Sequence, residues 1–209
     1  ADPFEINGTK FTQTTYGWFH KKALQSAVSL DKTMLKPGLL CEHLEGSWTE
    51  LYSTAPWMPA VKTTTAEREM DLSQVKREDA YYGARFKGFI DIPADGVYTF
   101  RAPKEVVYPE TAASYDLRLY IDGQEWDPSE WWHARGTWSV PLAKGIHTFQ
   151  VDFADARTTP WKNSGLWRNY PHPWSVYQGD PSPILVSGPG LEEQRIPKEW
   201  LFRVTNSKR

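Results

Sequence analysis

Turn-forming residues interrupt this chain so often that they restrict what it can fold into. The sequence has 16 prolines and 14 glycines among 209 residues, spaced at short intervals. Proline ends helices and both residues favour turns, so few stretches remain for a helix of ordinary length. Short segments between frequent turns are typical of strands, and the spacing therefore predicts an all-β protein.

Alternating apolar and polar residues support this prediction in the middle of the chain. In residues 84–92, Phe86, Ile90 and Ile92 alternate with mostly charged neighbours, which is the pattern of a strand with one buried face. Four more segments have strand-like patterns: residues 97–101, 116–121, 138–142 and 145–153. Many short strands without intervening helices predict two packed antiparallel sheets, an antiparallel β-sandwich.

Turn sequences indicate how these strands are joined. Residues 93–96 read Pro-Ala-Asp-Gly and predict a β-hairpin with the strand that follows. Residues 143–145 predict a second hairpin, and Asp122-Gly123 predicts a tight turn after residue 121. Residues 65–79 are rich in charged side chains but have few apolar ones, so we expect a loop there with at most one helical turn.

The two flanks differ from this centre in composition. Residues 1–35 contain one alternating stretch, and residues 156–209 are rich in proline, tryptophan and turn-forming residues. We therefore expect a sandwich over residues 36–155, with irregular N- and C-terminal extensions wrapped on it.

Charge and motifs exclude several classes of function. The chain has 24 Lys+Arg and 26 Asp+Glu, a net charge of −2, so it has no overall basic field to hold nucleic acid. No run approaches the roughly 18 apolar residues of a membrane span. Cys41 is the only cysteine, which excludes an intramolecular disulfide and paired-cysteine zinc sites; in its predicted strand it reads as a small buried hydrophobe. Common catalytic motifs such as GxSxG, HExxH and the P-loop do not occur, so we expect no enzyme activity.

Five motifs in the centre of the chain occur in an order and spacing that resemble the protective-antigen-type (PA-fourteen) domain. They lie at residues 38–40, 57–59, 82–100, 117–123 and 140–147. The resemblance covers residues 36–155 and implies a jelly-roll-like β-sandwich. Residues 183–197 also look like the segment that closes such modules in multidomain bacterial glycosidases.

This resemblance implies a non-catalytic carbohydrate-binding module, usually attached to a secreted glycoside hydrolase or forming the head of an adhesin. The partners it implies are a glycan and a catalytic domain of the same parent chain, with the module itself a monomer outside the cell, in the periplasm or on the cell surface. A structural accessory module that packs on a catalytic domain without holding sugar is the alternative.

Lectin members of this family hold calcium with two successive aspartates just before the strand at residues 117–121. Here those positions are Ser114 and Tyr115, and Asp116 stands where glycine is expected. Calcium takes roughly six to eight oxygen ligands, so the loss of both carboxylates removes the strongest part of the site. The resemblance implies a calcium ion only if the loop is shifted so that Asp116 becomes a ligand. A calcium-dependent adhesin head is therefore a further alternative, and no other cofactor is predicted.

Flat rings and hydrogen-bonding groups are densest just after the strand at residues 117–121. They are Trp126, Asp127, Glu130, Trp131, Trp132 and His133. A pyranose stacks its C–H face on an indole, and its hydroxyls pair with carboxylate and imidazole groups. With Tyr115 and Asp116, which the resemblance puts at the same end, these residues form the predicted carbohydrate site. In an extended loop Trp131 and Trp132 cannot both point outward, so the alternative is that at least one packs into the sandwich.

A second aromatic group follows the sandwich. It consists of Trp161, Trp167, Tyr170, Trp174 and Tyr177, spaced among prolines in a pattern that fits neither helix nor strand. Three interpretations remain open: a second sugar platform, a surface that docks on a catalytic domain, or a long loop pinned to the sandwich by its own rings. The five histidines are scattered, and His147 reads as a structural histidine.

Overall fold

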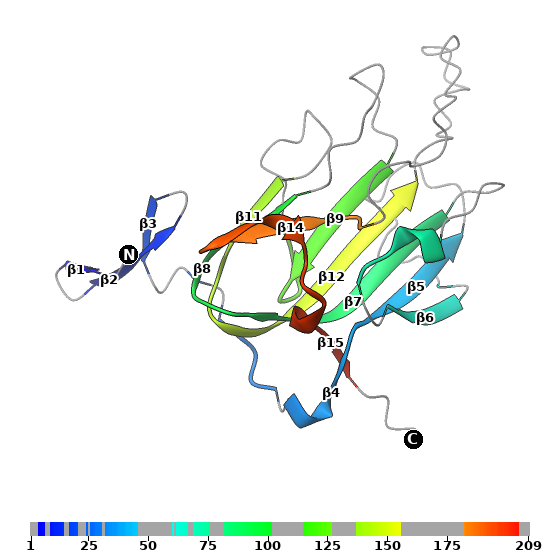
Figure 1. Ribbon diagram of the computed structural model, residues 1–209, viewed down its shortest axis with the longest axis horizontal. Coiled ribbons are helices and arrows are strands. Elements are labelled where there is room, and N and C mark those ends of the chain that lie inside the picture. Colours follow the sequence, from blue (N-terminus) through cyan, green and yellow to red (C-terminus); the bar gives the residue numbers. More distant parts are fainter. Residues whose placement is uncertain are drawn as a thin grey trace, which may run out of the picture.

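A computed structural model describes residues 4–6, 9–14, 17–20, 24, 26–30, 32–45, 60, 62–66, 69–75, 82–101, 115–126, 137–155 and 182–204. Antiparallel strands make up most of these residues (Figure 1), and the helical segments among them are three short 3-10 turns: η2 (Lys32–Met34), η4 (Leu72–Gln74) and η7 (Lys198–Trp200). The prediction of an all-β sandwich is confirmed. In residues 65–79, where we expected a loop with at most one helical turn, the described part contains the end of a strand at residues 65–66 and the turn η4.

The larger layer is an eight-stranded sheet. Its strands are β4 (Leu35–Pro37), β5 (Leu39–Glu45), β6 (Lys62–Ala66), β7 (Tyr82–Ile92), β9 (Tyr115–Ile121), β10 (Gln124–Trp126), β12 (Gly145–Asp155) and β15 (Leu201–Val204). The order is β10-β9-β12-β7-β15-β4, and the edge of β7 that faces β15 also pairs with β5, which in turn pairs with β6. Both edges of strand β7 are therefore paired with other strands of this sheet.

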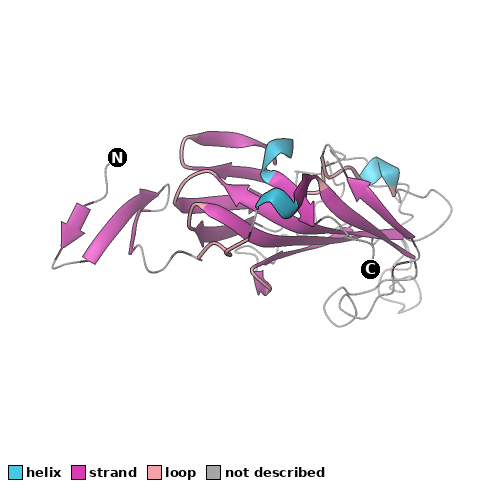
Figure 2. Ribbon diagram, turned by 90° about the horizontal axis from the view of Figure 1, so that it is seen from below, coloured by secondary structure: helices cyan, strands magenta, loops and turns pink. Residues whose placement is uncertain are grey.

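The smaller layer is a four-stranded sheet with the order β11-β8-β13-β14. Its strands are β8 (Gly96–Arg101), β11 (Thr137–Leu142), β13 (Leu185–Gly188) and β14 (Leu191–Arg195). Figure 2 shows the two sheets as stacked layers. Strands β1 (Phe4–Ile6), β2 (Thr9–Thr14) and β3 (Gly17–His20) pair only with one another, in a small separate sheet next to β8.

Apolar side chains from both sheets fill the space between the layers. Phe86 and Phe153 from the larger sheet and Trp138 from the smaller one are buried. The rings of Phe100 and Phe149 meet across the interface with centroids 6.1 Å apart. Burying each such side chain contributes roughly 1.5–3 kcal/mol, so this interface is the main source of stability.

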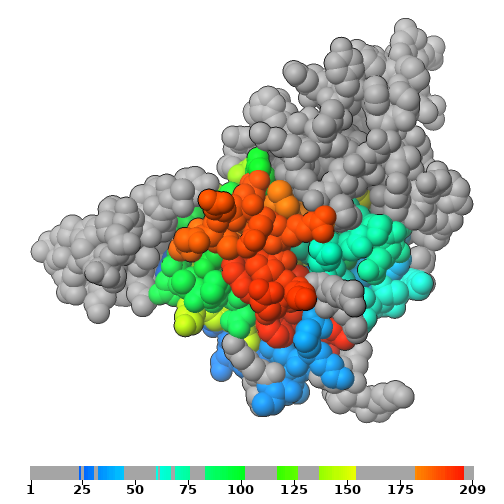
Figure 3. All heavy atoms as spheres, in the orientation of Figure 1, coloured from blue at the N-terminus to red at the C-terminus, as the bar shows by residue number. Residues whose placement is uncertain are grey.

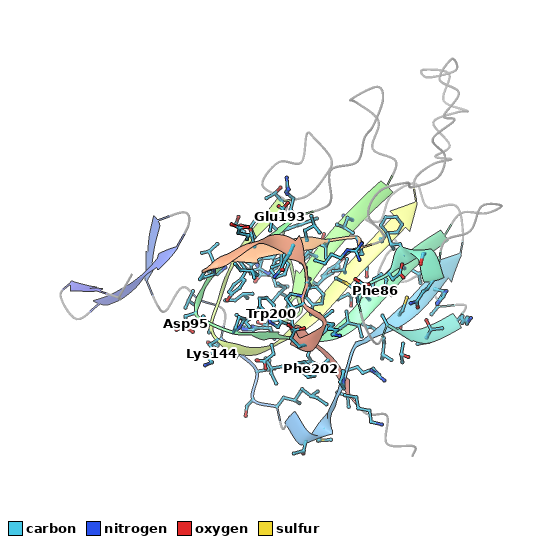
Figure 4. The ribbon with its side chains drawn as sticks, viewed as in Figure 1. Phe86, Asp95, Lys144, Glu193, Trp200 and Phe202 are labelled. Atoms are coloured by element: carbon cyan, nitrogen blue, oxygen red, sulfur yellow. The ribbon has the colours of Figure 1, made fainter. Side chains whose placement is uncertain are left out.

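The two predicted β-hairpins are wrong, because each turn joins strands of different sheets. β7 pairs with β12 on one edge and with β5 and β15 on the other, so neither edge is open to β8. Likewise β11 pairs with β8, whereas β12 pairs with β7 and β9. The turns at residues 93–95 and 143–144 therefore cross between the layers. Asp95 Oδ1 accepts a hydrogen bond from the Lys144 backbone N–H at 2.7 Å, which ties the two crossings together at one corner (Figure 4).

The tight turn predicted at Asp122-Gly123 does close a hairpin, between β9 and β10. Both residues have positive φ, 52° and 75°, as the favoured two-residue hairpin turns require. Asp122 also accepts a hydrogen bond from the Thr148 backbone N–H at 3.0 Å, so the turn is fixed to the neighbouring strand β12.

The sandwich extends beyond residue 155. Three strands from the part predicted as a C-terminal extension belong to it: β13 and β14 complete the smaller sheet, and β15 pairs with β7 in the larger one. Figure 3 shows this segment, in orange and red, gathered on one face of the molecule. Trp200, which lies between β14 and β15 in the chain, packs its ring edge-on against Tyr98, with the ring centroids 6.2 Å apart.

Candidate functional site

The strands of the larger sheet end together at one end of the sandwich. Glu45 on β5 pairs with Tyr82 on β7, and Asp155 on β12 pairs with Tyr115 on β9. The opposite end carries the short turns at residues 93–95, 122–123, 143–144 and 189–190. We name the first end, where residues 46–61, 76–81, 102–114, 127–136 and 156–184 connect the strands, the long-connection end.

Tryptophan is concentrated in these connecting sequences. Seven of the 11 tryptophans lie in residues 46–61, 127–136 and 156–184: Trp48, Trp57, Trp131, Trp132, Trp161, Trp167 and Trp174. Long connections carry function more often than the scaffold that holds them. The long-connection end is therefore the candidate site.

Of the predicted site residues, the structure describes three. Tyr115 and Asp116 begin β9 at the long-connection end, whereas Trp126 on β10 pairs with Leu119, four residues further along β9 and close to the turn at residues 122–123. Asp127, Glu130, Trp131, Trp132 and His133 lie outside the described residues, as does the second aromatic group.

Trp126 is half-buried and packs against the hydrophobic core, so only part of its ring is open to a ligand. Within the described part of the chain, the buried Nε1 atoms of Trp126 and Trp138 have no hydrogen-bond partner. The two tryptophans stand on either side of residues 127–136. Leaving a buried donor unpaired costs about 1–3 kcal/mol, so an oxygen atom that reached either indole would be held there.

A row of ion pairs crosses the outer face of the larger sheet. Arg85 donates to both carboxylate oxygens of Asp152, at 2.9 and 3.2 Å, and lies 3.6 Å from Glu42. Asp152 is almost completely buried, and its burial raises the pKa of the carboxyl group, against the opposing effect of Arg85. On the next strand Arg118 pairs with Glu125 at 2.7 Å. The first group links β5, β7 and β12, and the second links β9 to β10. The sequence patterns did not reveal these ion pairs because each charge looks like a solvated surface residue.

Two other groups have structural roles. His147 is fully buried, with Nδ1 2.7 Å from Asp122 Oδ2 and Nε2 2.8 Å from the Ala143 carbonyl, so it is the satisfied structural histidine that the sequence suggested. Among the described residues no three His, Cys, Asp or Glu side chains are grouped to hold a metal ion. No helix in the described part of the chain is long and apolar enough to cross a membrane.

Comparisons with known proteins find similarity in structure only. No family model matches the sequence, and no curated protein matches it either. Among solved structures, the A domain of Epithelial Adhesin 9 (Epa9A) from Candida glabrata, in complex with Galβ1-4GlcNAc, matches with a TM-score of 0.52 and 9% identity, over 89% of this chain and 98% of that one.

Two further solved structures match, and they differ in how much of the matched chain this chain covers. An anti-sigma factor domain-containing protein matches with a TM-score of 0.50 and 14% identity, over 80% of this chain and 48% of that one. This chain thus spans about half the length of that relative. The PA14 domain of the antifreeze protein MpAFP matches with a TM-score of 0.44 and 12% identity, over 86% of this chain and 96% of that one.

The chain therefore shares the fold of the Epa9A domain, an antiparallel β-sandwich of the class that its ordered motifs suggested. Identities this low show the fold alone.

Proposed function

We propose that this chain is a non-catalytic carbohydrate-binding domain whose glycan site lies at the long-connection end. The observation that carries the proposal is the gathering of seven of the 11 tryptophans in sequences that connect strands there. The fold supports it, because the Epa9A structure of the same fold holds a disaccharide.

In this proposal the indole rings of Trp131 and Trp132 stack on the C–H face of a pyranose. Asp127, Glu130 and His133 accept or donate hydrogen bonds at its hydroxyls, with Tyr115 and Asp116 at the same end and Trp126 next to Asp127 in the chain. A rigid ring loses little conformational entropy when it binds a rigid ligand. One such site would bind with a dissociation constant of about 1 mM to 1 μM, worth roughly 4–8 kcal/mol.

We further propose that the domain acts through proximity, outside the cell, by holding a glycan near a glycoside hydrolase domain of its parent chain. Tethering raises the effective concentration of the glycan even when each contact is weak. The resemblance of residues 183–197 to closing segments of glycosidase modules supports this part of the proposal.

The test is a glycan array probed with the whole chain, once with calcium and once with chelator. Binding that survives chelation supports a site built on stacking alone. Binding lost with chelator indicates that Asp116 takes part in a calcium site of the adhesin type. Absence of binding in both conditions would overturn the proposal and favour the structural accessory module, which the packing of Trp126 against the core also suits.

Single variants locate the site. Trp131→Ala and Trp132→Ala should each weaken binding at least tenfold while the thermal unfolding midpoint stays near that of the parent. Met34→Ala is the matched control, because Met34 is an exposed apolar side chain outside the long-connection end. Unchanged affinity in both tryptophan variants would exclude the proposed platform.

A further inference from the structure

A groove lies on the outer face of the larger sheet, away from the candidate site. The edge of β7 is shared there by two strands, with Lys87 pairing to β5 and Phe89 pairing to β15. Gly88 stands at this fork, where an added Cβ would lie 2.3 Å from the Phe202 carbonyl oxygen. The fork opens a cavity of about 400 Å³, which is within the range of small-molecule sites, about 300–1,000 Å³.

The floor of the groove is a row of side chains in register across four strands. Leu40 on β5 pairs with Lys87 on β7, Lys87 with Gln150 on β12, and Gln150 with Tyr120 on β9. Their chain neighbours, such as Phe86 and Val151, are buried in the core, so the alternation of strand side chains turns this row outward. All four residues of the row line the groove.

Two aromatic rings flank the centre of this floor. Tyr120 on β9 and Phe89 on β7 both line the groove, and β12 runs between their strands with Thr148 and Gln150. Two strand spacings separate β9 from β7, a distance of about 10 Å. A ring that entered between them would have the hydroxyl of Thr148 and the amide of Gln150 beneath it. Arg203 and Val204 of β15 form the wall.

The charges at the floor are compensated within the protein. Lys87 forms an ion pair with Glu42, and Arg85 beside it pairs with Asp152. Gln150 donates to Asp152 at 3.0 Å, which fixes its amide group. The floor therefore offers rings and fixed hydrogen-bonding groups without a net charge, and on the wall the Arg203 guanidinium donates to the Pro37 carbonyl.

We propose that this groove is a second carbohydrate site, which takes one neutral pyranose unit. Apolar rings with hydroxyl and amide groups between them complement the C–H faces and hydroxyl edges of a neutral sugar. The site shares no residue with the one at the long-connection end, so either can exist without the other.

The test is a titration of the whole ¹⁵N-labelled chain with galactose, glucose, mannose and N-acetylglucosamine, each followed by NMR. At least one sugar should shift the amide signals of Lys87, Phe89, Tyr120 and Thr148. Thr148→Trp fills the groove and should lower the affinity at least tenfold at these signals. Thr63→Trp is the matched control, since Thr63 is exposed on β6 of the same sheet, does not line the groove, and should leave the affinity unchanged.

Should Thr148→Trp fail to fold, Val204→Trp narrows the groove from its wall, where Val204 is 39% exposed. Groove signals that stay unshifted with all four sugars, or that shift equally in the filled variant, would overturn the inference. Shifts that depend on protein concentration without sugar would assign the groove to a second copy of the chain and also overturn it. Signals of Tyr115 and Asp116 report separately on the long-connection end, and their response should persist in Thr148→Trp.

Discussion

Burial controls the chemistry of individual polar residues in this sandwich. The Cys41 thiol is almost completely buried, and burial raises its pKa from 9.0 to about 11. Burial likewise raises the pKa of the Tyr98 phenol from 10.0 to about 12, although its hydroxyl donates to the Ala94 carbonyl. Both groups therefore stay protonated in the folded chain at pH values where the unfolded chain loses the proton.

This difference predicts a loss of stability in alkali. Each group adds stability that is fully present below its ordinary pKa and is lost as the pH rises to the folded value, from 9 to 11 for Cys41 and from 10 to 12 for Tyr98. In its window each lowers the free energy of unfolding by up to about 1.4 kcal/mol per pH unit. Urea unfolding at several pH values should show a shallower decline for Cys41→Ala and for Tyr98→Phe than for the parent. Equal slopes would contradict the assignment.

His147 is expected to be important for stability despite its polarity. His147→Ala removes a fully buried ring and takes away the partner of Asp122 Oδ2 and of the Ala143 carbonyl. The cost should be about 3 kcal/mol, the sum of a cavity and unpaired polar atoms. His43→Ala is the control, because His43 is half-buried and, among the described residues, bonds to the Thr64 hydroxyl alone, so it should cost less than about 1 kcal/mol. Similar losses in the two variants, measured by urea unfolding, would refute this role.

At the scale of strands, the ion pairs on the larger sheet act as cross-strand ties. Arg85 on β7 reaches Glu42 on β5 and Asp152 on β12, so one guanidinium bridges three adjacent strands. A buried ion pair is costly to break because the remaining charge stays desolvated.

Arg85→Met should therefore destabilise the chain by about 3–5 kcal/mol, since it leaves the Asp152 carboxylate buried without its cation. The double variant Arg85→Met/Asp152→Leu should recover most of this loss. Arg195→Met is the matched control, because Arg195 pairs with Glu69 at an exposed position and should cost less than about 1 kcal/mol. If the double variant is as unstable as Arg85→Met, the loss does not come from the unpaired Asp152 carboxylate, and this explanation is wrong.

For the whole molecule, the decisive feature is that the C-terminal strands complete both layers. β13 and β15 supply the buried side chains Val186 and Leu201, and they cover edges of β8 and β7. By contrast, the sheet of β1, β2 and β3 pairs only with itself.

Truncation at either end should separate the contribution of β13 to β15 to stability from that of β1 to β3. A chain that ends at Asp155 should lose its cooperative thermal transition, because the core loses one side and two strand edges are exposed. A chain that begins at Lys21 should keep the transition with nearly the same midpoint. Cooperative unfolding of the chain that ends at Asp155 would show that the sandwich is complete without β13 to β15.

The positions of the central strands β7, β8, β9, β11 and β12 were predictable from local patterns, whereas the C-terminal strands β13 to β15 and the strand pairing were not. Alternation at Phe86, Ile90 and Ile92 placed β7 to within two residues, because side-chain period and turn chemistry are properties of neighbouring residues. The same patterns correctly predicted a turn at residues 93–95, but they wrongly predicted that it closes a β-hairpin. Its actual role depends on β5, β12 and β15, which occupy both edges of β7 from distant parts of the sequence.

The candidate site residues divide in the same way. The sequence alone identified the aromatic cluster from Trp126 to His133, because the types of residue reveal their chemistry wherever they lie. Only the tertiary structure showed that the ends of β5, β7, β9 and β12 lie side by side at one end of the sandwich, and that Lys87, Gln150 and Tyr120 line one groove. Side chains on different strands come together through backbone hydrogen bonds between segments far apart in the chain, and no local pattern records that pairing.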